Sequence, residues 1–290
     1  MDYHSDRFQD SSLLVYKDDA IYALLPANRV DRIVYSHQGL TYGGLLLSPK
    51  AKLEETTAAF RAVLQYLNQA GVNYLNVKII PSFYNLYPSD ELQYFAYLTE
   101  AMLVGRDLIM LIDLRRQLGF QKNRREGINK ARRNGLEVRE VDGFHDFWNQ
   151  ILIPNLDQKH GARPVHSLEE IELLASRFPE RIRQVNVYKG QELVAGTTLF
   201  LTQTTIHPQY VSANADKNVL GSLDLLYDHI IREYADGRDY FDFNTSSEQG
   251  GKVLNPGLIF WKETCGARPH TIDNYLIETA SFNRLTLPLK

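Results

Sequence analysis

Cysteine is nearly absent from this chain of 290 residues, which contains only one, and long apolar runs are absent as well. One cysteine excludes an internal disulfide framework and any metal site built from several cysteines. No stretch approaches the ~18 uninterrupted apolar residues that a membrane-spanning helix needs. The first twelve residues are polar and lack the apolar core of a signal peptide. We therefore expect a cytoplasmic protein with no membrane span.

A strong charge of either sign is also missing. The formal net charge is −3, with 23% charged and 44% hydrophobic residues. These values are typical of a globular protein and exclude a disordered tail or a fibre. The chain lacks the overall positive charge typical of nucleic-acid-binding proteins, although a local basic patch is compatible with these values. The length allows one large domain or two modest ones.

Several common functional motifs do not occur. The sequence contains no G-x-G-x-x-G, no G-x-x-x-x-G-K-[ST], no H-E-x-x-H and no G-x-S-x-G. It therefore gives no support to the usual dinucleotide, P-loop, zincin or α/β-hydrolase sites.

Apolar patterning predicts runs of strands interrupted by helices. The predicted strands are 13–16, 21–25, 33–35, 45–47, 74–80, 108–114, 136–141, 183–188, 193–201, 205–212 and 240–243. The predicted helices are 53–67, 91–102, 117–134, 144–158, 168–178 and 220–234. Because the strands come in runs, this order is not that of a Rossmann fold.

The second half repeats the plan of the first. Val15-Tyr16-Lys17 and Val187-Tyr188-Lys189 each begin a strand–turn–strand series, and each series is followed by an amphipathic helix. A glycine then ends each helix, and the next strand begins with Tyr74 or Tyr240. The spacing of about 165–172 residues is too long for a solenoid. Two related α/β halves explain it, although this order of elements is common enough to arise by chance.

Scattered segments carry a family resemblance. They are 195–197, 209–214, 221–226, 240–243, 260–263 with Gly266, and the basic segment 124–133. Together they resemble the Fem-like branch of the GNAT acyltransferase superfamily, which includes FemAB-type and BioF2-like proteins. The resemblance implies an α/β (α+β) fold of two fused GNAT-like domains, each a mixed, mostly antiparallel sheet flanked by helices.

The resemblance also implies domain bounds. The first GNAT-like domain would cover 1–116, a basic connecting helix 117–135, and the second domain 136–290. A Fem-like first domain normally begins with an extra strand and helix, so this chain would begin inside that helix.

The function implied is N-acyl transfer, with an acetyl group moving from acyl-CoA to an amine on a cell-envelope or polysaccharide precursor. The acceptor would be a small molecule, or a lipid- or nucleotide-linked amino sugar or peptide. One alternative is an aminoacyl-tRNA-dependent aminoacyltransferase of the peptidoglycan type, which the near-neutral charge disfavours. The other is a GNAT-fold protein that binds without catalysis. No metal is expected.

The acyl-CoA loop of the superfamily has only a partial counterpart. Backbone N–H groups of a Q/R-x-x-G-x-G/A loop hold pyrophosphate at a helix N-terminus. The corresponding segment, 217–223, keeps one glycine of two and lacks the initial glutamine or arginine. Asn218, Gly221 and Ser222 are the candidate cofactor-binding residues.

Two residues are candidate catalytic groups. Asp242 lies in a short strand after the helix 220–234, where a GNAT-like sheet would open toward substrate, and could act as a base. The alternative is an acid on the solvent face of an alternating strand. His37 lies in the glycine-rich segment 35–44 and could bind a phosphate or sugar hydroxyl or act as a base. The alternative is that it belongs to a self-satisfied turn.

The candidate substrate-binding residues come from loops, a strand end and the basic helix, and are expected to line a cleft between the halves. They are Tyr42, Tyr84, Asp90, Arg124, His166, Gln209, Tyr210 and Asn214. Ordinary alternatives exist, since Asp90 or Ser89 can cap a helix and basic stripes are commonly only solvated. His166 ends the segment 159–166, whose two histidines lack metal-ligand spacing. Cys265 is expected as a packed thiol in an apolar strand.

Overall fold

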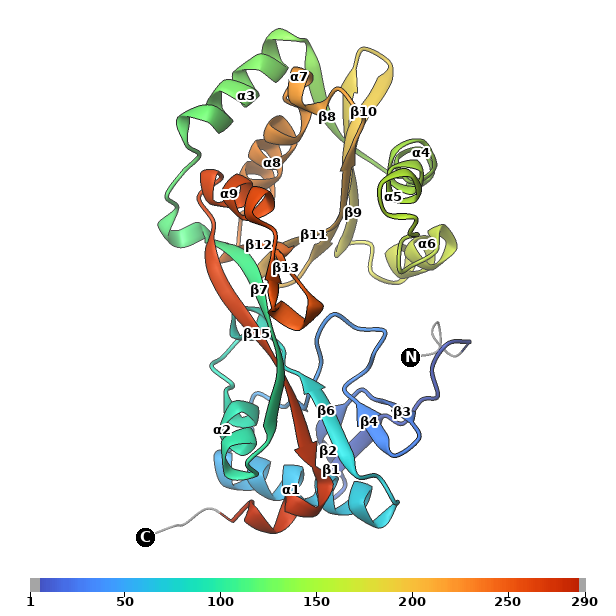
Figure 1. The fold of residues 1–290 in the computed structure, drawn as a ribbon, viewed down its shortest axis with the longest axis vertical. Coiled ribbons are helices and arrows are strands. Elements are labelled where there is room, and N and C mark those ends of the chain that lie inside the picture. The colour runs from blue at the N-terminus through green and yellow to red at the C-terminus, as the bar shows by residue number, and fades with distance from the viewer. Residues whose placement is uncertain (1–5, 287–290) are drawn as a thin grey trace. The chain divides into compact units, whose positions relative to one another are not determined.

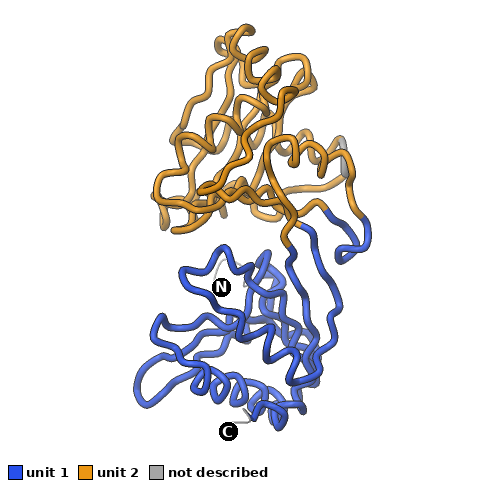
Figure 2. Tube along the Cα trace, turned by 90° about the vertical axis from the view of Figure 1, so that its left-hand side faces the viewer, with its two compact units in different colours: residues 1–108, 247–253, 271–290 blue, residues 109–246, 254–270 orange. Residues whose placement is uncertain are grey.

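The computed structural model describes residues 6–286, without the side chains of Lys159 and His160. The chain forms two compact units (Figures 1 and 2). Unit 1 comprises residues 1–108, 247–253 and 271–290, and unit 2 comprises residues 109–246 and 254–270. Within the described ranges, no helix is long and apolar enough to cross a membrane.

The described part of unit 1 includes a three-stranded sheet, four strands that belong to a larger sheet, and two α-helices. In pairing order, the strands are β1 (Leu13–Lys17), β2 (Ala20–Leu25) and β5 (Leu46–Leu47) in one sheet, and β3 (Asn28–Val30), β4 (Ile33–Tyr35), β6 (Tyr74–Lys78) and β15 (Arg268–Glu278) in the other. Strand β4 pairs in parallel with β6. Helix α1 (Leu53–Gln69) buries Phe60, Val63 and Leu64 at helical spacing, and α2 (Glu91–Leu98) buries Phe95.

Unit 2 is built on a mixed sheet with helices on both faces. Its strands, in pairing order, are β7 (Met102–Asp113, which begins in unit 1), β12 (Tyr240–Thr245), β11 (Thr205–Ala213), β10 (Glu192–Leu201), β9 (Ile182–Lys189) and β8 (Leu136–Val141). Neighbouring strands are antiparallel except β11 and β12, which are parallel.

The two faces of the unit 2 sheet carry different helices (Figure 1). One side holds α3 (Lys122–Arg133), α7 (Lys217–Leu220), α8 (Ser222–Glu233) and α9 (Pro256–Thr264). The other side holds α4 (His145–Phe147), a π-helical turn (Trp148–Leu152), α5 (Ile153–His160) and α6 (Leu168–Arg177). Each side has its own apolar core.

The predicted basic helix is present as α3. Ile128 and Ala131 are buried beneath it, while most of its charged side chains are exposed. This amphipathic pattern explains why α3 packs on the sheet despite its strong positive charge. The mixed α/β fold class predicted from the sequence is confirmed.

The prediction of an apolar strand around Cys265 is wrong. Residues 256–264 form α9, and Cys265 follows it as the C-cap residue. Asn255 caps the helix by accepting from the Leu258 N–H at 3.0 Å, and Pro256 occupies the first turn. This N-cap and proline pair favours a helix over a strand. The burial expected for the thiol is confirmed.

Candidate functional site

In unit 2 the two parallel strands pair only briefly and then part. The described backbones of β11 and β12 pair at Thr205 with Tyr240 and at Ile206 with Phe241. We call the segments that follow, 207–213 of β11 and 242–245 of β12, the unit 2 wedge. Helix α8 connects the two strands. Beyond these two pairs the facing backbone groups of β11 and β12 no longer pair with each other, which makes the wedge a candidate site.

His207 and Asp242 face each other at the start of the wedge. The His207 Nδ1 lies 3.0 Å from Asp242 Oδ2, and His207 Nε2 lies 3.0 Å from Gln209 Oε1. Both side chains of the pair are buried, with exposed fractions of 5% and 4%. Ile206, Phe241 and Phe243 belong to the core beneath α3 and α8. Strand alternation therefore directs His207 and Asp242 to the opposite face.

A β-bulge re-aims the side chains of β11. The pairing with β10 shifts between Thr198–Tyr210 and Leu199–Pro208, so Gln209 is the extra residue. Beyond it, Tyr210 joins the core beneath α4–α6. Without the bulge, Tyr210 would lie on the same face as Ile206. The bulge thus brings Tyr210 to the face that already carries His207 and Gln209, and both Gln209 and Tyr210 are predicted site residues.

The turn after β12 is held by a buried lysine. Lys262 Nζ donates to Asn244 O at 3.0 Å, Thr245 O at 2.8 Å and Ser246 Oγ at 2.8 Å. Burial lowers the Lys262 pKa to about 8, although the negative charge of Asp242 opposes this shift. Asn244 has a positive φ of 64°, and its N–H donates to Asp242 Oδ1 at 2.7 Å. The lysine therefore fixes the turn that holds the Asp242 carboxylate.

Residues from the α5–α6 side reach the same strand. Pro154 has no N–H to continue the helical ladder, which accounts for the π-helical turn before it. The next residue, Asn155, donates to Ser212 Oγ at 2.8 Å and Ala213 O at 2.7 Å. His166 Nδ1 lies 2.7 Å from the Tyr210 hydroxyl, and burial raises the Tyr210 pKa. His166 and Tyr210, predicted separately, are thus in contact.

In unit 1 the parallel strands are β4 and β6, and the loop that follows β4 occupies the gap between them. After β4 and β6 part, residues 36–44 return so that Gly43 forms a parallel bridge with Ile79. The Gly43 N–H donates to Lys78 O at 2.7 Å, and the Ile80 N–H donates to Gly43 O at 3.1 Å. A Cβ on Gly43 would lie 2.0 Å from Ser36 O. Only glycine fits here, and the backbone groups of the gap are already used.

The predicted residues of unit 1 belong to this loop and its neighbour. His37 is buried with a φ of 64°, and its Nδ1 accepts from the Gly39 N–H at 3.1 Å. Tyr42 and Tyr84 are in ring contact at 4.8 Å. Tyr84 lines a hollow of about 320 Å³ whose walls include Leu45 and Leu92. Asp90 occupies the N-cap position of α2, but its side chain accepts from Gln93 instead of capping the helix.

The predicted cofactor loop lies where α3 packs closely on α8. A Cβ on Gly221, whose φ is 73°, would lie 2.3 Å from Gly127 O. The Gly221 N–H donates to Lys217 O at 2.8 Å, Asn218 O accepts from Lys130 at 3.2 Å, and Ser222 is fully buried. These groups already have partners or are enclosed.

Arg124, a predicted substrate-binding residue, faces the buried side of α3. Its guanidinium donates to Asp224 Oδ1 at 2.8 Å, and both side chains are largely buried. Burial raises the Asp224 pKa, and Arg124 opposes that shift. The pair therefore joins α3 to the first turn of α8, which is a structural role visible in the contacts.

Sequence reasoning missed His207 and Lys262 as site residues. His207 was read only as part of a strand, and its distance to Asp242 depends on pairing across 35 positions. Alternation with Gln209 was the one local signal that could have marked it. Asn214, also predicted, follows β11 and its N–H donates to Val194 O at 2.9 Å. Across residues 6–286, apart from the two omitted side chains, no group of three His, Cys, Asp or Glu could hold a metal ion.

Comparison with known proteins places this geometry in context. The acetyltransferase (GNAT) domain family matches residues 120–251, which contain His207, Gln209 and Asp242. No curated relative matches the chain.

Solved structures are similar over most of the chain. The C-terminal DUF2156 domain of a predicted lysylphosphatidylglycerol synthetase from Agrobacterium fabrum is 14% identical, with a TM-score of 0.62 over 96% of this chain and 86% of that one. FemX is 10% identical, with a TM-score of 0.62 over 92% and 88%. L-PGS from Bacillus licheniformis is 14% identical, with a TM-score of 0.57 over 94% and 88%. The chain therefore shares the fold of these proteins, and its residues 120–251 match the GNAT acetyltransferase domain.

Proposed function

We propose that the chain is an acyltransferase whose chemistry takes place at the unit 2 wedge. One observation carries the proposal: a buried histidine–carboxylate pair lies where β11 and β12 part, within the region that matches the GNAT acetyltransferase domain. A buried histidine–carboxylate pair in contact is a typical arrangement of catalytic groups.

The chemistry needs one proton to leave the acceptor. The amine nitrogen forms a C–N bond with the donor's acyl carbon, and the donor's C–S or C–O bond then breaks. The amine loses a proton, and the leaving thiolate or alkoxide gains one. For His207 to act as base, its Nδ1–H donates to Asp242 and the Gln209 Oε1 must turn away from Nε2, so that the Nε2 lone pair meets the amine. Nε2 then takes the proton and passes it to the leaving group, and the Asp242 carboxylate stabilises the imidazolium in between.

Two donor classes fit this chemistry. Acyl-CoA is the donor that GNAT domains generally use, with Asn218, Gly221 and Ser222 as its proposed contacts. The close approach of Gly127 to Gly221 and the buried Ser222 weigh against a pyrophosphate at this helix start. They favour the second candidate, an aminoacyl donor, which needs no pyrophosphate cradle. A similar structure is named for lysylphosphatidylglycerol synthesis, and an aminoacyl donor would be consistent with that relative.

The acceptor we propose is an amine on a cell-envelope or polysaccharide precursor. Gln209, Tyr210, His166 and Asn214 would contact it in unit 2, since the first two follow His207 on β11 and His166 contacts Tyr210. Tyr42, Tyr84 and Asp90 of unit 1 remain proposed acceptor contacts. His37, the second candidate catalytic residue, is buried and its Nδ1 accepts from the Gly39 N–H.

Substitution of the pair tests the proposal. We expect Asp242→Asn and His207→Gln to lower kcat by roughly 100-fold or more, because general acid–base groups contribute 10²–10⁴-fold. The matched control is Asp146→Asn, which alters an exposed histidine–aspartate pair, His145 and Asp146, on α4. The control should turn over like wild type. Unchanged turnover in Asp242→Asn, with circular dichroism showing an intact fold, would contradict the assignment.

A donor comparison separates the alternatives. Acetyl-CoA and an aminoacyl-tRNA would each be offered with an amino-sugar nucleotide, and transfer followed by mass spectrometry. Transfer from acetyl-CoA supports the first donor, and transfer from aminoacyl-tRNA alone supports the second. Binding of the acceptor without transfer from either donor would instead indicate a non-catalytic binding protein and refute the proposal.

A further inference from the structure

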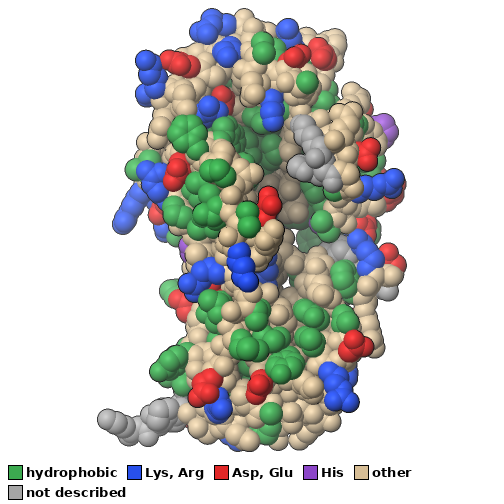
Figure 3. Space-filling model, in the orientation of Figure 1, with side chains coloured by type: hydrophobic (Ala, Val, Ile, Leu, Met, Phe, Trp, Pro, Cys, Tyr) green, Lys and Arg blue, Asp and Glu red, His purple; other side chains and the backbone are tan. Residues whose placement is uncertain are grey.

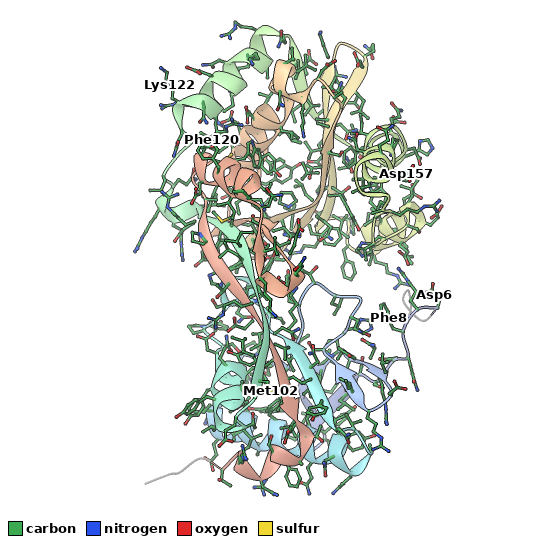
Figure 4. All side chains as sticks on the ribbon, in the orientation of Figure 1. Asp6, Phe8, Met102, Phe120, Lys122 and Asp157 are labelled. Carbon is green, nitrogen blue, oxygen red and sulfur yellow. The ribbon has the colours of Figure 1, made fainter. Side chains whose placement is uncertain are left out.

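Unit 2 has a hollow of its own on the face of the sheet opposite to the face that carries His207 and Asp242. Its volume is about 530 Å³, within the range of small-molecule sites. It is formed by α3, α8, Cys265 and the loop before α3, and Figure 4 marks Phe120 in that loop. The residues that line it are Ile112, Gln117, Leu118, Gly119, Phe120, Arg125, Ile128, Asn129, Arg132, Asp228, Ile231, Arg232 and Cys265. We call it the α3–α8 hollow.

The floor of the α3–α8 hollow is apolar. Ile112, Ile128, Ile231 and Cys265 are all buried members of the core beneath α3 and α8. His207 and Asp242 point to the other face of the sheet, as argued above. The hollow is therefore separate from the proposed acyl-transfer site, and an inference about it does not rest on that proposal.

The rim carries three guanidinium groups and one carboxylate. Asp228, itself buried, accepts from Arg132 at 3.1 Å through Oδ2 and from Arg232 at 2.9 Å through Oδ1. One carboxylate thus orients two arginines, and each guanidinium keeps further N–H donors. Because the two arginines are already held in place, a ligand would lose less side-chain entropy on binding them.

Arg125 supplies the third positive charge without a partner. It is exposed, and its side chain makes no hydrogen bond or ion pair with any described residue. The only acid on α3, Glu126, lies near Lys122 at 3.9 Å and does not line the hollow. Basic side chains extend along the α3 region of the surface in Figure 3. The hollow therefore presents three positive charges against one negative charge.

We propose that the α3–α8 hollow binds a phosphate ester. The arginine rim would hold the phosphate oxygens through forked N–H contacts, which match phosphate geometry. The apolar floor would cover the organic part of the ester, an aromatic ring or an alkyl chain. Inorganic phosphate would meet the rim alone and bind more weakly.

Calorimetry on the full chain tests this proposal with three probes: inorganic phosphate, adenosine monophosphate and hexyl phosphate. We expect saturable binding of at least one ester, at least tenfold tighter than inorganic phosphate. The preferred ester distinguishes a nucleotide from an alkyl phosphate. Arg125→Ala should weaken ester binding at least tenfold, and thermal unfolding should stay unchanged because the side chain has no described partner.

The matched control is Lys122→Ala. It removes one positive charge from the same helix, and Figure 4 marks Lys122 on the exposed outer side of α3. The affinity of the Lys122→Ala protein for the ester should stay within twofold of the wild-type affinity. The proposal is overturned if neither ester binds saturably, or if inorganic phosphate binds as tightly as the esters. Equal weakening by Lys122→Ala and Arg125→Ala would overturn it too, because that result means diffuse attraction to a basic surface.

Discussion

Lys262 combines deep burial with three hydrogen bonds, and its protonation is linked to the stability of the fold. Its pKa is lowered from 10.5 to about 8 by burial, so the native state releases the proton more readily than the unfolded state. Between pH 8 and 10.5 the unfolded chain therefore binds more protons. By linkage, the contribution of Lys262 to stability rises with pH in that window.

Chemical unfolding at several pH values checks this linkage. The free energy of unfolding of wild type, relative to Lys262→Met, should rise by up to about 3 kcal/mol from pH 8 to pH 10.5. Lys122→Met, which removes an exposed lysine, should show no such relative rise. A difference for Lys262→Met that stays flat or falls across this window would show that the native amine is not held as described.

Part of the candidate site could be predicted from the sequence alone. Asp242, Gln209 and Tyr210 were predicted because they lie in recognisable short segments. His207 was missed because only the parallel pairing of β11 with β12 brings it to Asp242. The bulge at Gln209 is a backbone register shift that Gln209 itself does not reveal, although Pro208 beside it is a residue typical of bulges.

Among the helices, the contact between α3 and α8 depends on two glycines, Gly127 within α3 and Gly221 at the start of α8. A Cβ on Gly127 would lie 1.8 Å from Oδ2 of Asp224, the carboxylate whose Oδ1 pairs with Arg124. Glycine inside a helix is ordinarily unfavourable. Here it allows the helices to approach closely enough for the pair to form.

Gly127→Ala should therefore destabilise unit 2 although alanine is the better helix former. We expect a loss of about 1–3 kcal/mol, since a forced overlap in a packed contact has that cost. Thermal and chemical unfolding would measure it. Gly143→Ala is the comparison variant because nothing lies within 4 Å of its added Cβ, and it should be neutral or slightly stabilising. A Gly127→Ala protein as stable as wild type would mean that the two helices are not in close contact.

The elements near the C-terminus were the least predictable. Helix α9 has a readable start in Asn255 and Pro256, but its apolar run of Leu258, Ile259, Phe260 and Trp261 equally suits a strand. Strand β15 was not predicted, and its partner strand β6 lies about 200 positions earlier in the chain. Apolar runs specify burial, whereas pairing over such distances is decided by the tertiary fold.

At the scale of the whole molecule, neither unit is one continuous stretch of chain. Unit 2 begins at Ile109 and so includes the end of β7 and all of α3. The second domain predicted from the sequence begins later, at residue 136. The two boundaries predict that different fragments of the chain fold on their own, so fragments that begin at residue 109 or at residue 136 distinguish them.

A fragment of residues 109–270 should unfold cooperatively when it is heated. Circular dichroism would monitor this unfolding. A fragment of residues 136–290 should not, because it lacks Ile112, Ile128 and Ala131 of the core beneath α3 and α8. It also leaves Asp224 without Arg124, and an unpaired buried charge is strongly destabilising. Cooperative unfolding of the shorter fragment would support the sequence-based boundary instead.

The loop that fills the gap between β4 and β6 has a consequence for the duplicated plan. Because Gly43 uses the backbone groups of that gap, unit 1 cannot offer a second copy of the reaction centre proposed in unit 2. The chain has two versions of the architecture but no spare. If the proposed centre is the site of reaction, a single covalent modification of the His207–Asp242 pair would abolish turnover by the whole chain.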